Sequence, residues 1–233
     1  MSVLLQISDT HFGTEQPAVM RALEQFAHAQ QPDLVVLSGD ITQRATRAQF
    51  RAARAFVDRL GAPAVLAIPG NHDIPLFALG ARLVDPYGRY CEAFGPALEP
   101  VFESPGCLAI AVNTTRWYRH EDGGVSPAQI ERVAQRLAGA TAQQLRVVVV
   151  HQPLGVTLPQ DASNRLHGRD AAARQWAAAG ADLVLGGHIH LPFVQPLHEV
   201  IAACPRPLWG VQAGTAVASR VRRGAPNSVN VNR

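Results

Sequence analysis

Five apolar runs in this sequence each end in side chains that can bind a metal ion or transfer a proton. The run 64–68 ends in Pro69-Gly70-Asn71-His72-Asp73, and comparable ends follow the runs 3–7, 34–37, 146–150 and 183–185. The polar side chains at these ends are Asp9, His11, Asp40, Asn71, His72, Asp73, His151, His188 and His190. One such end could be only a capped turn. Polar groups are costly to bury without partners, however, so their recurrence after buried strands favours a shared binding site.

The chemistry of these side chains indicates divalent metal ions. Parallel strands place their carboxyl ends along one edge of a sheet, so the five ends should lie close together. Carboxylate, amide and imidazole groups without a thiolate suit Mn, Fe or Zn ions. There are more donors than one ion normally takes, so we expect two divalent metal ions that share a carboxylate. Two ions about 3.5–4 Å apart can activate a bridging hydroxide for in-line attack at phosphorus, which predicts phosphoester hydrolysis.

Strands that alternate with amphipathic helices must position these ends. Apolar strands are expected over 3–8, 33–38 and 64–68, with helices over 17–29 and 46–60 between them. This order of elements predicts parallel strands joined by right-handed crossovers. Further helices are expected over 75–83, 87–94, 127–137 and 169–179.

The remaining segments have a β pattern. Residues 98–103 and 107–113 are expected to form a hairpin across the turn Ser104-Pro105-Gly106. After His190, the proline-interrupted segments 193–197, 200–204 and 207–213 have no helices between them, which favours antiparallel pairing. We also expect 212–218 and 229–231 to pair at the edge of a second sheet.

Composition sets modest bounds on the class of protein. With 233 residues, 47% of them hydrophobic, the chain fits a single domain over residues 1–233. The net charge is only +3 and the arginines are scattered, so no duplex nucleic acid is expected as a partner. Cys91, Cys107 and Cys204 form no CxxC pair, which favours free thiols in a reducing compartment. No leader and no membrane span is recognisable, so a cytoplasmic location is expected.

The ordered motifs resemble the calcineurin-like metallophosphoesterase superfamily. They are Asp9-x-His11, Gly39-Asp40, Gly70-Asn71-His72-Asp73, His151 and Gly187-His188-x-His190. The resemblance implies a mixed α/β (α+β) fold, a four-layer αββα sandwich with two central mixed β-sheets and the metal site at the carboxyl ends of the strands. It implies that one ion is held by Asp9, His11 and His190, the other by Asn71, His151 and His188, and that Asp40 bridges them. His72 would face the scissile phosphate and Asp73 would orient it.

The finer resemblance is to bacterial class III cyclic-nucleotide phosphodiesterases. It rests on Ile7-Ser8-Asp9-Thr10-His11-Phe12-Gly13, Gly39-Asp40-Ile41-Thr42 and Gly124-Val125-Ser126-Pro127-x-Gln129. Protein Ser/Thr phosphatases carry Asp-Arg-Gly after the bridging aspartate, where this chain has Thr42-Gln43-Arg44. We therefore expect a small phosphodiester substrate, with a 3′,5′-cyclic nucleotide as one candidate. A phosphatase, a glycerophosphodiesterase and a nuclease of the same superfamily stay open, whereas a non-catalytic scaffold is disfavoured because all the ligands are present.

Two loop histidines are the candidates for substrate contacts. His120 and His167 both lie in loops that could overhang the metal ions. Trp117 and Tyr118 could stack on a base, although packing on their own domain explains them equally well. The sequence leaves open whether the protein forms a homodimer.

Overall fold

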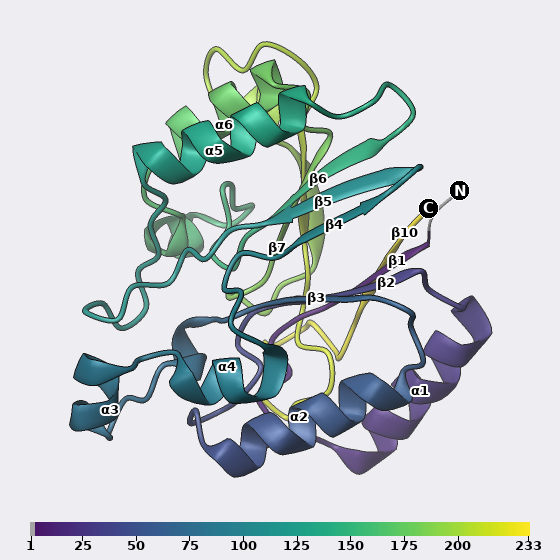
Figure 1. Cartoon of the computed structure of the whole chain (residues 1–233), viewed down its shortest axis with the longest axis vertical. Coiled ribbons are helices and arrows are strands. Elements are labelled where there is room, and N and C mark those ends of the chain that lie inside the picture. Colours follow the sequence, from purple (N-terminus) through teal and green to yellow (C-terminus); the bar gives the residue numbers. More distant parts are fainter. Residues whose placement is uncertain (1–2) are drawn as a thin grey trace.

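Two β-sheets packed face to face occupy the centre of the computed structural model, which describes residues 3–233 (Figure 1). The first sheet has the order β10-β1-β2-β3, with the bounds Asn230–Asn232, Leu4–Ile7, Leu34–Ser38 and Val65–Ile68. The second has the order β4-β5-β6-β7-β9-β8, with the bounds Val101–Ser104, Cys107–Ala111, Leu145–Val149, Leu183–Gly186, Trp209–Gln212 and Phe193–Pro196. Both sheets are mixed, because parallel central strands are flanked by the antiparallel edge strands β10, β4 and β8.

Helices cover the outer faces of the two sheets, which confirms the predicted four-layer αββα sandwich (Figure 1). The first sheet is covered by α1 (Pro17–Gln30), α2 (Arg47–Arg59) and α4 (Gly88–Phe94). The second sheet is covered by α5 (Pro127–Ala138) and α6 (Arg169–Ala178). Short elements complete the chain, namely η1 (Asn71–Asp73), α3 (Leu79–Val84), η2 (Pro159–Asn164) and α7 (Leu197–Val200).

The layering follows from the alternation of side chains along the central strands. In β2, Val35 and Leu37 pack against the helices on the outer face, whereas Leu34 and Val36 pack against the second sheet. Successive residues of a strand point to opposite faces, so a strand that is apolar at every position must be covered on both sides. The continuous apolar runs in the sequence therefore become the strands between two layers.

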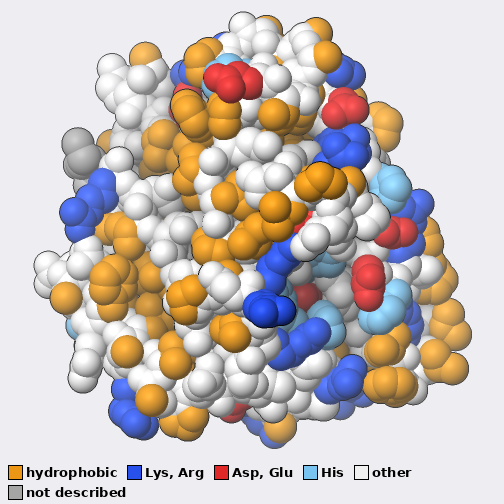
Figure 2. Space-filling view, turned by 180° about the vertical axis from the view of Figure 1, so that it is seen from behind, with side chains coloured by type: hydrophobic (Ala, Val, Ile, Leu, Met, Phe, Trp, Pro, Cys, Tyr) orange, Lys and Arg blue, Asp and Glu red, His pale blue; other side chains and the backbone are white. Residues whose placement is uncertain are grey.

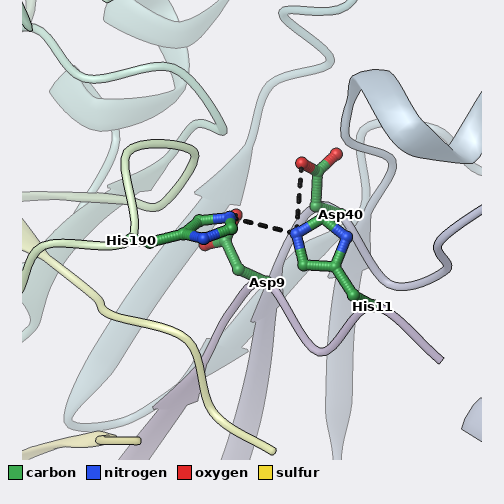
Figure 3. Close-up of side chains that lie close together, drawn as sticks. All are labelled: Asp9, His11, Asp40 and His190. Atoms are coloured by element: carbon green, nitrogen blue, oxygen red, sulfur yellow. Dashed lines mark hydrogen bonds and ion pairs between the residues drawn. The ribbon is translucent and has the colours of Figure 1, made fainter. Parts of the chain in front are cut away.

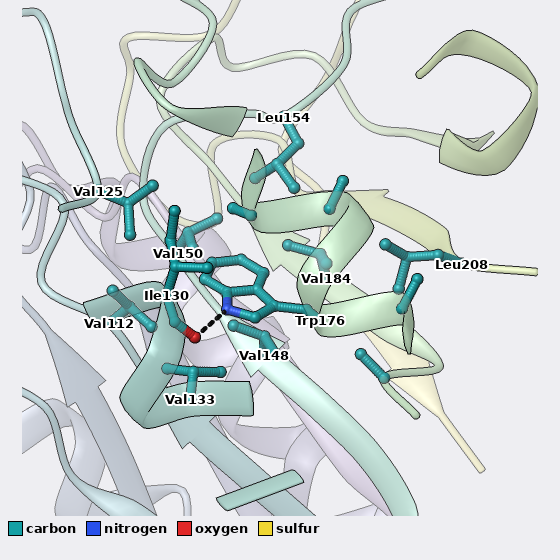
Figure 4. Close-up of a cluster of buried hydrophobic side chains, with 14 of the residues drawn as sticks. Val112, Val125, Ile130, Val133, Val148, Val150, Leu154, Trp176, Val184 and Leu208 are labelled. Atoms are coloured by element: carbon teal, nitrogen blue, oxygen red, sulfur yellow. Dashed lines mark hydrogen bonds between the residues drawn. The ribbon is translucent and has the colours of Figure 1, made fainter. Parts of the chain in front are cut away.

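Trp176 is the largest fully buried side chain over the second sheet (Figure 4). Its ring packs among residues of α5 and of the sheet, including Val148 and Val184. The indole Nε1 donates a hydrogen bond of 3.2 Å to the carbonyl of Ile130 in α5. Because this bond satisfies the buried indole donor, Trp176 links α6 to α5 without an unpaired polar group.

Two helices begin where their caps predict. The Thr46 side chain accepts a hydrogen bond from the backbone N–H of Gln49 at the start of α2. Ser126 caps α5 in the same way, and the side chain of Gln129 accepts a hydrogen bond from the Ser126 backbone N–H. These bonds satisfy N–H groups that have no partner within the helix, and so they set the first turn of each helix.

Two predicted segments differ from the structure. The expected helix over 75–83 begins only at Leu79 and ends at Val84. The expected β segment over 200–204 is wrong, because α7 ends at Val200 and a turn follows it. Ala203 in this turn has a φ of 60°, a left-handed conformation that a strand does not accommodate.

The C-terminal edge strand forms, but in the other sheet. β10 pairs antiparallel with β1 of the first sheet, so the predicted pairing with 212–218 is wrong. Nδ2 of Asn230 also donates to the Gln212 carbonyl of β9 (3.2 Å), and just before β10 the backbone N–H of Ser228 donates to the Thr215 carbonyl (3.0 Å). The alternation of apolar and polar residues in a sequence identifies an edge strand. It does not identify the sheet edge with which that strand pairs.

Within residues 3–233, the helices are too short or too polar to cross a membrane. Cys91, Cys107 and Cys204 are all free thiols, as predicted.

Candidate metal centre

The seven predicted metal ligands meet where the carboxyl ends of the two sheets face each other. Asp9, Asp40 and Asn71 follow β1, β2 and β3 of the first sheet. His151 and His188 follow β6 and β7 of the second sheet, and His11 and His190 lie two residues beyond Asp9 and His188. The site is thus built from two sheet edges rather than from one.

A first group is formed by Asp9, His11, Asp40 and His190 (Figure 3). Their ligand atoms all lie within 4.8 Å of one another. Nε2 of His11 is 3.0 Å from Nε2 of His190, which is in turn 3.3 Å from Oδ1 of Asp9. Two imidazole nitrogens and carboxylate oxygens that converge in this way could hold one divalent ion.

A second group is formed by Asp40, His151 and His188, with Asn71 between the two imidazoles. Oδ1 of Asn71 lies 3.2 Å from Nε2 of His151 and 3.1 Å from Nδ1 of His188. Asp40 belongs to both groups, because its Oδ1 is 3.3 Å from Nε2 of His151 and its Oδ2 is 3.8 Å from Nε2 of His11. The two oxygens of this buried carboxylate therefore face different groups.

Five of the seven side chains are held by an unusual backbone conformation. Positive φ angles occur at Asp9 (50°), His11 (40°), Asp40 (48°), His188 (74°) and His190 (56°). Such angles are uncommon outside glycine, although Asp and His tolerate them better than most residues. The chain therefore bends sharply after β1, β2 and β7, at the site residues themselves.

Backbone carbonyls fix the orientation of two imidazoles. Nδ1 of His151 lies 2.8 Å from the carbonyl of Ser38, and Nδ1 of His190 lies 2.8 Å from the carbonyl of Arg220. A carbonyl can only accept, so Nδ1 carries the hydrogen and the Nε2 lone pair of each neutral ring faces the site. Nδ1 of His11 is buried without a hydrogen-bond partner among residues 3–233. This donor set fits divalent metal ions.

Burial and charge act on the imidazoles in opposite directions. Burial lowers the pKa of His11 and of His188 to about 4, although the neighbouring carboxylates of Asp9 and Asp40 act to raise it. Burial also opposes the charge of His151, but the Asp40 carboxylate outweighs it and raises the pKa of His151 to about 9. Burial opposes the charge of Asp40 as well, yet His151 holds the pKa of this carboxyl well below its usual range. Without metal, the proton on His151 thus balances a buried negative charge that a divalent ion would otherwise neutralise.

Asp73 does not orient His72, which corrects the expectation from the sequence. The Asp73 carboxylate accepts hydrogen bonds of 2.8–2.9 Å from the backbone N–H groups of Ile41, Thr42 and Gly70 and from the Thr42 hydroxyl. Burial and the nearby Asp40 charge raise the pKa of Asp73 to about 6. The side chain is turned away from the cleft and holds the turn that carries Asp40, so sequence adjacency to His72 is not contact.

His72 itself faces an open cleft of about 240 Å³. Its backbone N–H donates to Oδ1 of Asp40 (2.9 Å), and its Nδ1 lies 3.2 Å from the Gln43 carbonyl. Besides ligands of the two groups, the cleft is lined by His72, Glu121, Asp161, Asn164, Ile189, Arg220 and Arg222. Figure 2 shows arginine and histidine side chains gathered around a hollow on this face of the molecule.

The two predicted substrate contacts lie outside this lining. His120 and His167 are exposed, and neither lines the cleft. The neighbour of His120, Glu121, does line it, so the polar loop 114–124 reaches the site through a different residue. Arg220 and Arg222 were not among the predicted site residues, because they lie in an irregular segment that carries no motif.

Comparisons with known proteins agree with this geometry. The profile of a family described as Calcineurin-like phosphoesterase matches residues 2–192. A probable cyclic nucleotide phosphodiesterase from Synechococcus is 32% identical over 205 residues, which cover 82% of this chain and 74% of that protein. A cAMP/cGMP dual specificity phosphodiesterase from Mycobacterium tuberculosis is 29% identical over 210 residues, which cover 81% of this chain and 61% of that protein.

A solved structure shows the same fold. The purple acid phosphatase from yellow lupin matches with a TM-score of 0.74 at 16% identity, over 97% of this chain and 46% of that chain. At this identity the likeness concerns the fold alone. The sequence profile, the curated relatives and the converging Asp and His side chains together show that the chain belongs to the calcineurin-like phosphoesterase family and is a metal-dependent phosphoester hydrolase.

Proposed function

We propose that this protein hydrolyses a small phosphodiester with two divalent metal ions, and that 3′,5′-cyclic nucleotides are the substrate class to which it is best suited. The observation that carries the dinuclear part is the position of Asp40, whose two oxygens face two separate ligand groups. The names of the two curated relatives support the substrate class.

The proposed division of the ligands between the ions is the one that the family resemblance implies. Asp9, His11 and His190 would hold one ion, Asn71, His151 and His188 would hold the other, and Asp40 would serve both. Imidazole, amide and carboxylate donors suit Mn, Fe or Zn. When bound, the ions supply an activated water as nucleophile and positive charge for the phosphoryl oxygens in an in-line displacement.

His72 is the group placed to serve the leaving oxygen. Its backbone N–H is bonded to the shared Asp40 carboxylate, so the ring is held beside the place where a phosphoryl group must sit. Nδ1 lies 3.2 Å from the Gln43 carbonyl, and Nε2 lies 3.4 Å from Nη1 of Arg220, which also lines the cleft. A proton delivered from Nε2 to an alkoxide leaving group would contribute about 10²- to 10⁴-fold in rate.

A substrate panel tests the proposal. The metal-stripped protein is reloaded with Mn²⁺, and rates are measured on bis(p-nitrophenyl) phosphate, p-nitrophenyl phosphate and 3′,5′-cyclic AMP. We expect faster turnover of the diesters than of the monoester. Faster monoester turnover would instead indicate a phosphatase. No turnover of any of the three with two ions bound would contradict the proposed substrate class.

The Asp40→Asn variant tests the dinuclear part. Because one carboxylate serves both groups, we expect the loss of both ions and of turnover, whereas Asn71→Ala should chiefly weaken one ion. Asp58→Asn is the matched control, since Asp58 is bonded to Arg54 on the surface of α2, away from the site. Two ions per chain with intact turnover in Asp40→Asn would contradict a dinuclear centre.

A further inference from the structure

Two arginines line the cleft in front of the candidate metal centre, and they differ in how their charge is compensated. Nη1 of Arg222 donates to both carboxylate oxygens of Asp161 at 2.9 Å, so this guanidinium is neutralised by a mostly buried partner. Arg220 forms an ion pair with no carboxylate within residues 3–233. An uncompensated cation beside a site for phosphoesters is suited to an anionic ligand.

Two neighbouring side chains fix the position of the Arg220 guanidinium. Its Nη1 donates to Oε1 of Gln43 (2.9 Å) and lies 3.4 Å from Nε2 of His72. Gln43 also binds Nδ1 of His72 through its carbonyl, so one residue holds both the imidazole and the guanidinium. In the part of the chain that the structure describes, Nε and Nη2 of Arg220 have no hydrogen-bond partner and remain free for a ligand.

The backbone of Arg220 has a separate role. Its carbonyl accepts the hydrogen bond from Nδ1 of His190 that orients this imidazole toward Asp9 and His11. A substitution of the side chain leaves that carbonyl in place. Metal binding and the function of the guanidinium can therefore be separated by experiment.

We propose that Arg220 binds the non-bridging phosphoryl oxygens of the substrate, and so acts as a phosphate-recognition residue beside His72. This inference rests on the proposed function for the reaction, but its ligand is any phosphate anion that enters the cleft. The planar guanidinium can donate two parallel hydrogen bonds to a phosphate, which an amide at this position cannot do. Arg222 is less suited to this role, because the Asp161 carboxylate that accepts from its Nη1 already balances its charge.

The test combines a binding measurement with kinetics. For the Mn²⁺-loaded protein, binding of inorganic phosphate is measured by calorimetry, and turnover of bis(p-nitrophenyl) phosphate is measured in parallel. In Arg220→Gln we expect phosphate binding to weaken and kcat/KM to fall, each about 10- to 100-fold, with both metal ions retained. Arg220→Lys keeps the positive charge but cannot donate two parallel hydrogen bonds. Its phosphate binding and kcat/KM should therefore lie between those of Arg220→Gln and the wild type. Added guanidinium ion should raise the activity of Arg220→Ala.

Arg223→Gln is the matched control, because Arg223 is exposed, lies three residues away and does not line the cleft. Unchanged phosphate binding in Arg220→Gln would overturn the inference, and so would a loss of metal that accounts for the loss of activity. A wild-type protein that binds phosphate through Arg220 but hydrolyses no diester would contradict the proposed function and leave the phosphate-recognition role supported.

Discussion

At the scale of single residues, the type of a side chain and its place after a strand were enough to predict which side chains gather at one site. All seven predicted side chains converge, because each one follows a strand whose end lies at the same side of the molecule. The direction of a side chain was not predictable in the same way. Asp73 lies next to His72 in the chain, yet its carboxylate turns to the N–H groups of Ile41, Thr42 and Gly70.

Arg220 shows a second limit at this scale. It enters the cleft from a segment without regular structure, 30 residues after His190 in sequence. Its place depends on the contacts with Gln43 and His72, which come from the first half of the chain. No local pattern in the sequence contains that information.

His72→Ala tests whether the imidazole donates a proton to the leaving oxygen. The ribose 3′-alkoxide of 3′,5′-cyclic AMP is a poor leaving group, so we expect its turnover to fall about 10²- to 10⁴-fold. A p-nitrophenolate leaves without a proton, so bis(p-nitrophenyl) phosphate should be affected much less. Both metal ions should remain bound, since the ring of His72 belongs to neither ligand group.

His28→Ala is the control for His72→Ala, because His28 bonds the Arg59 carbonyl at the far ends of α1 and α2. Equal losses on both substrates, or a loss of metal, would show that His72 acts by supporting Asp40 rather than as an acid.

At the scale of elements, hydrophobic periodicity predicted the strands and helices that form the layers. The β1-α1-β2-α2-β3 order and the hairpin of β4 and β5 are confirmed. The pairing of β10 was not predictable, because β1 and the second sheet both offer an edge near it. The alternation of apolar and polar residues over 227–233 is compatible with either edge. The choice depends on tertiary contacts rather than on the segment itself.

Two glycines provide a matched test of how β2 positions the site. Gly39 and Gly95 have nearly equal φ angles of 93° and 91°, so alanine is strained by a similar amount at both. A Cβ atom at Gly39 would collide with the imidazole of His151, whereas a Cβ atom at Gly95 would meet no atom within 4 Å. Gly39→Ala should therefore displace His151, weaken metal binding and lower turnover more than tenfold.

Gly95→Ala should cost stability, on the order of 1 kcal/mol, but leave metal content and turnover near the wild-type values. The measurements are metal content by mass spectrometry, turnover of bis(p-nitrophenyl) phosphate and thermal unfolding of both variants. If both variants lose activity and metal equally, strain of the backbone rather than the contact with His151 sets the geometry of the site.

At the scale of the whole molecule, the candidate metal centre joins the two halves of the sandwich. Asp9, Asp40 and Asn71 belong to strand ends of the first sheet, and the histidines that follow β6 and β7 belong to the second. A buried apolar cluster, which includes Leu34, Val36, Val147 and Val149, fills the space between the sheets. Metal ions bound across the sheet edges would add to this contact.

Metal removal should therefore lower the stability of the whole chain. A ligand at 100 times its Kd stabilises the folded state by about 2.7 kcal/mol, which for a chain of this length corresponds to a rise in Tm of about 5–10 °C. We expect a single calorimetric transition with Mn²⁺, and one at a Tm lower by about this amount in EDTA, because the cluster between the sheets keeps both halves cooperative without metal. Asp40→Asn should show the same Tm in both conditions. Two separate transitions in EDTA would show instead that the sheets unfold independently and that the metal ions are what couples them.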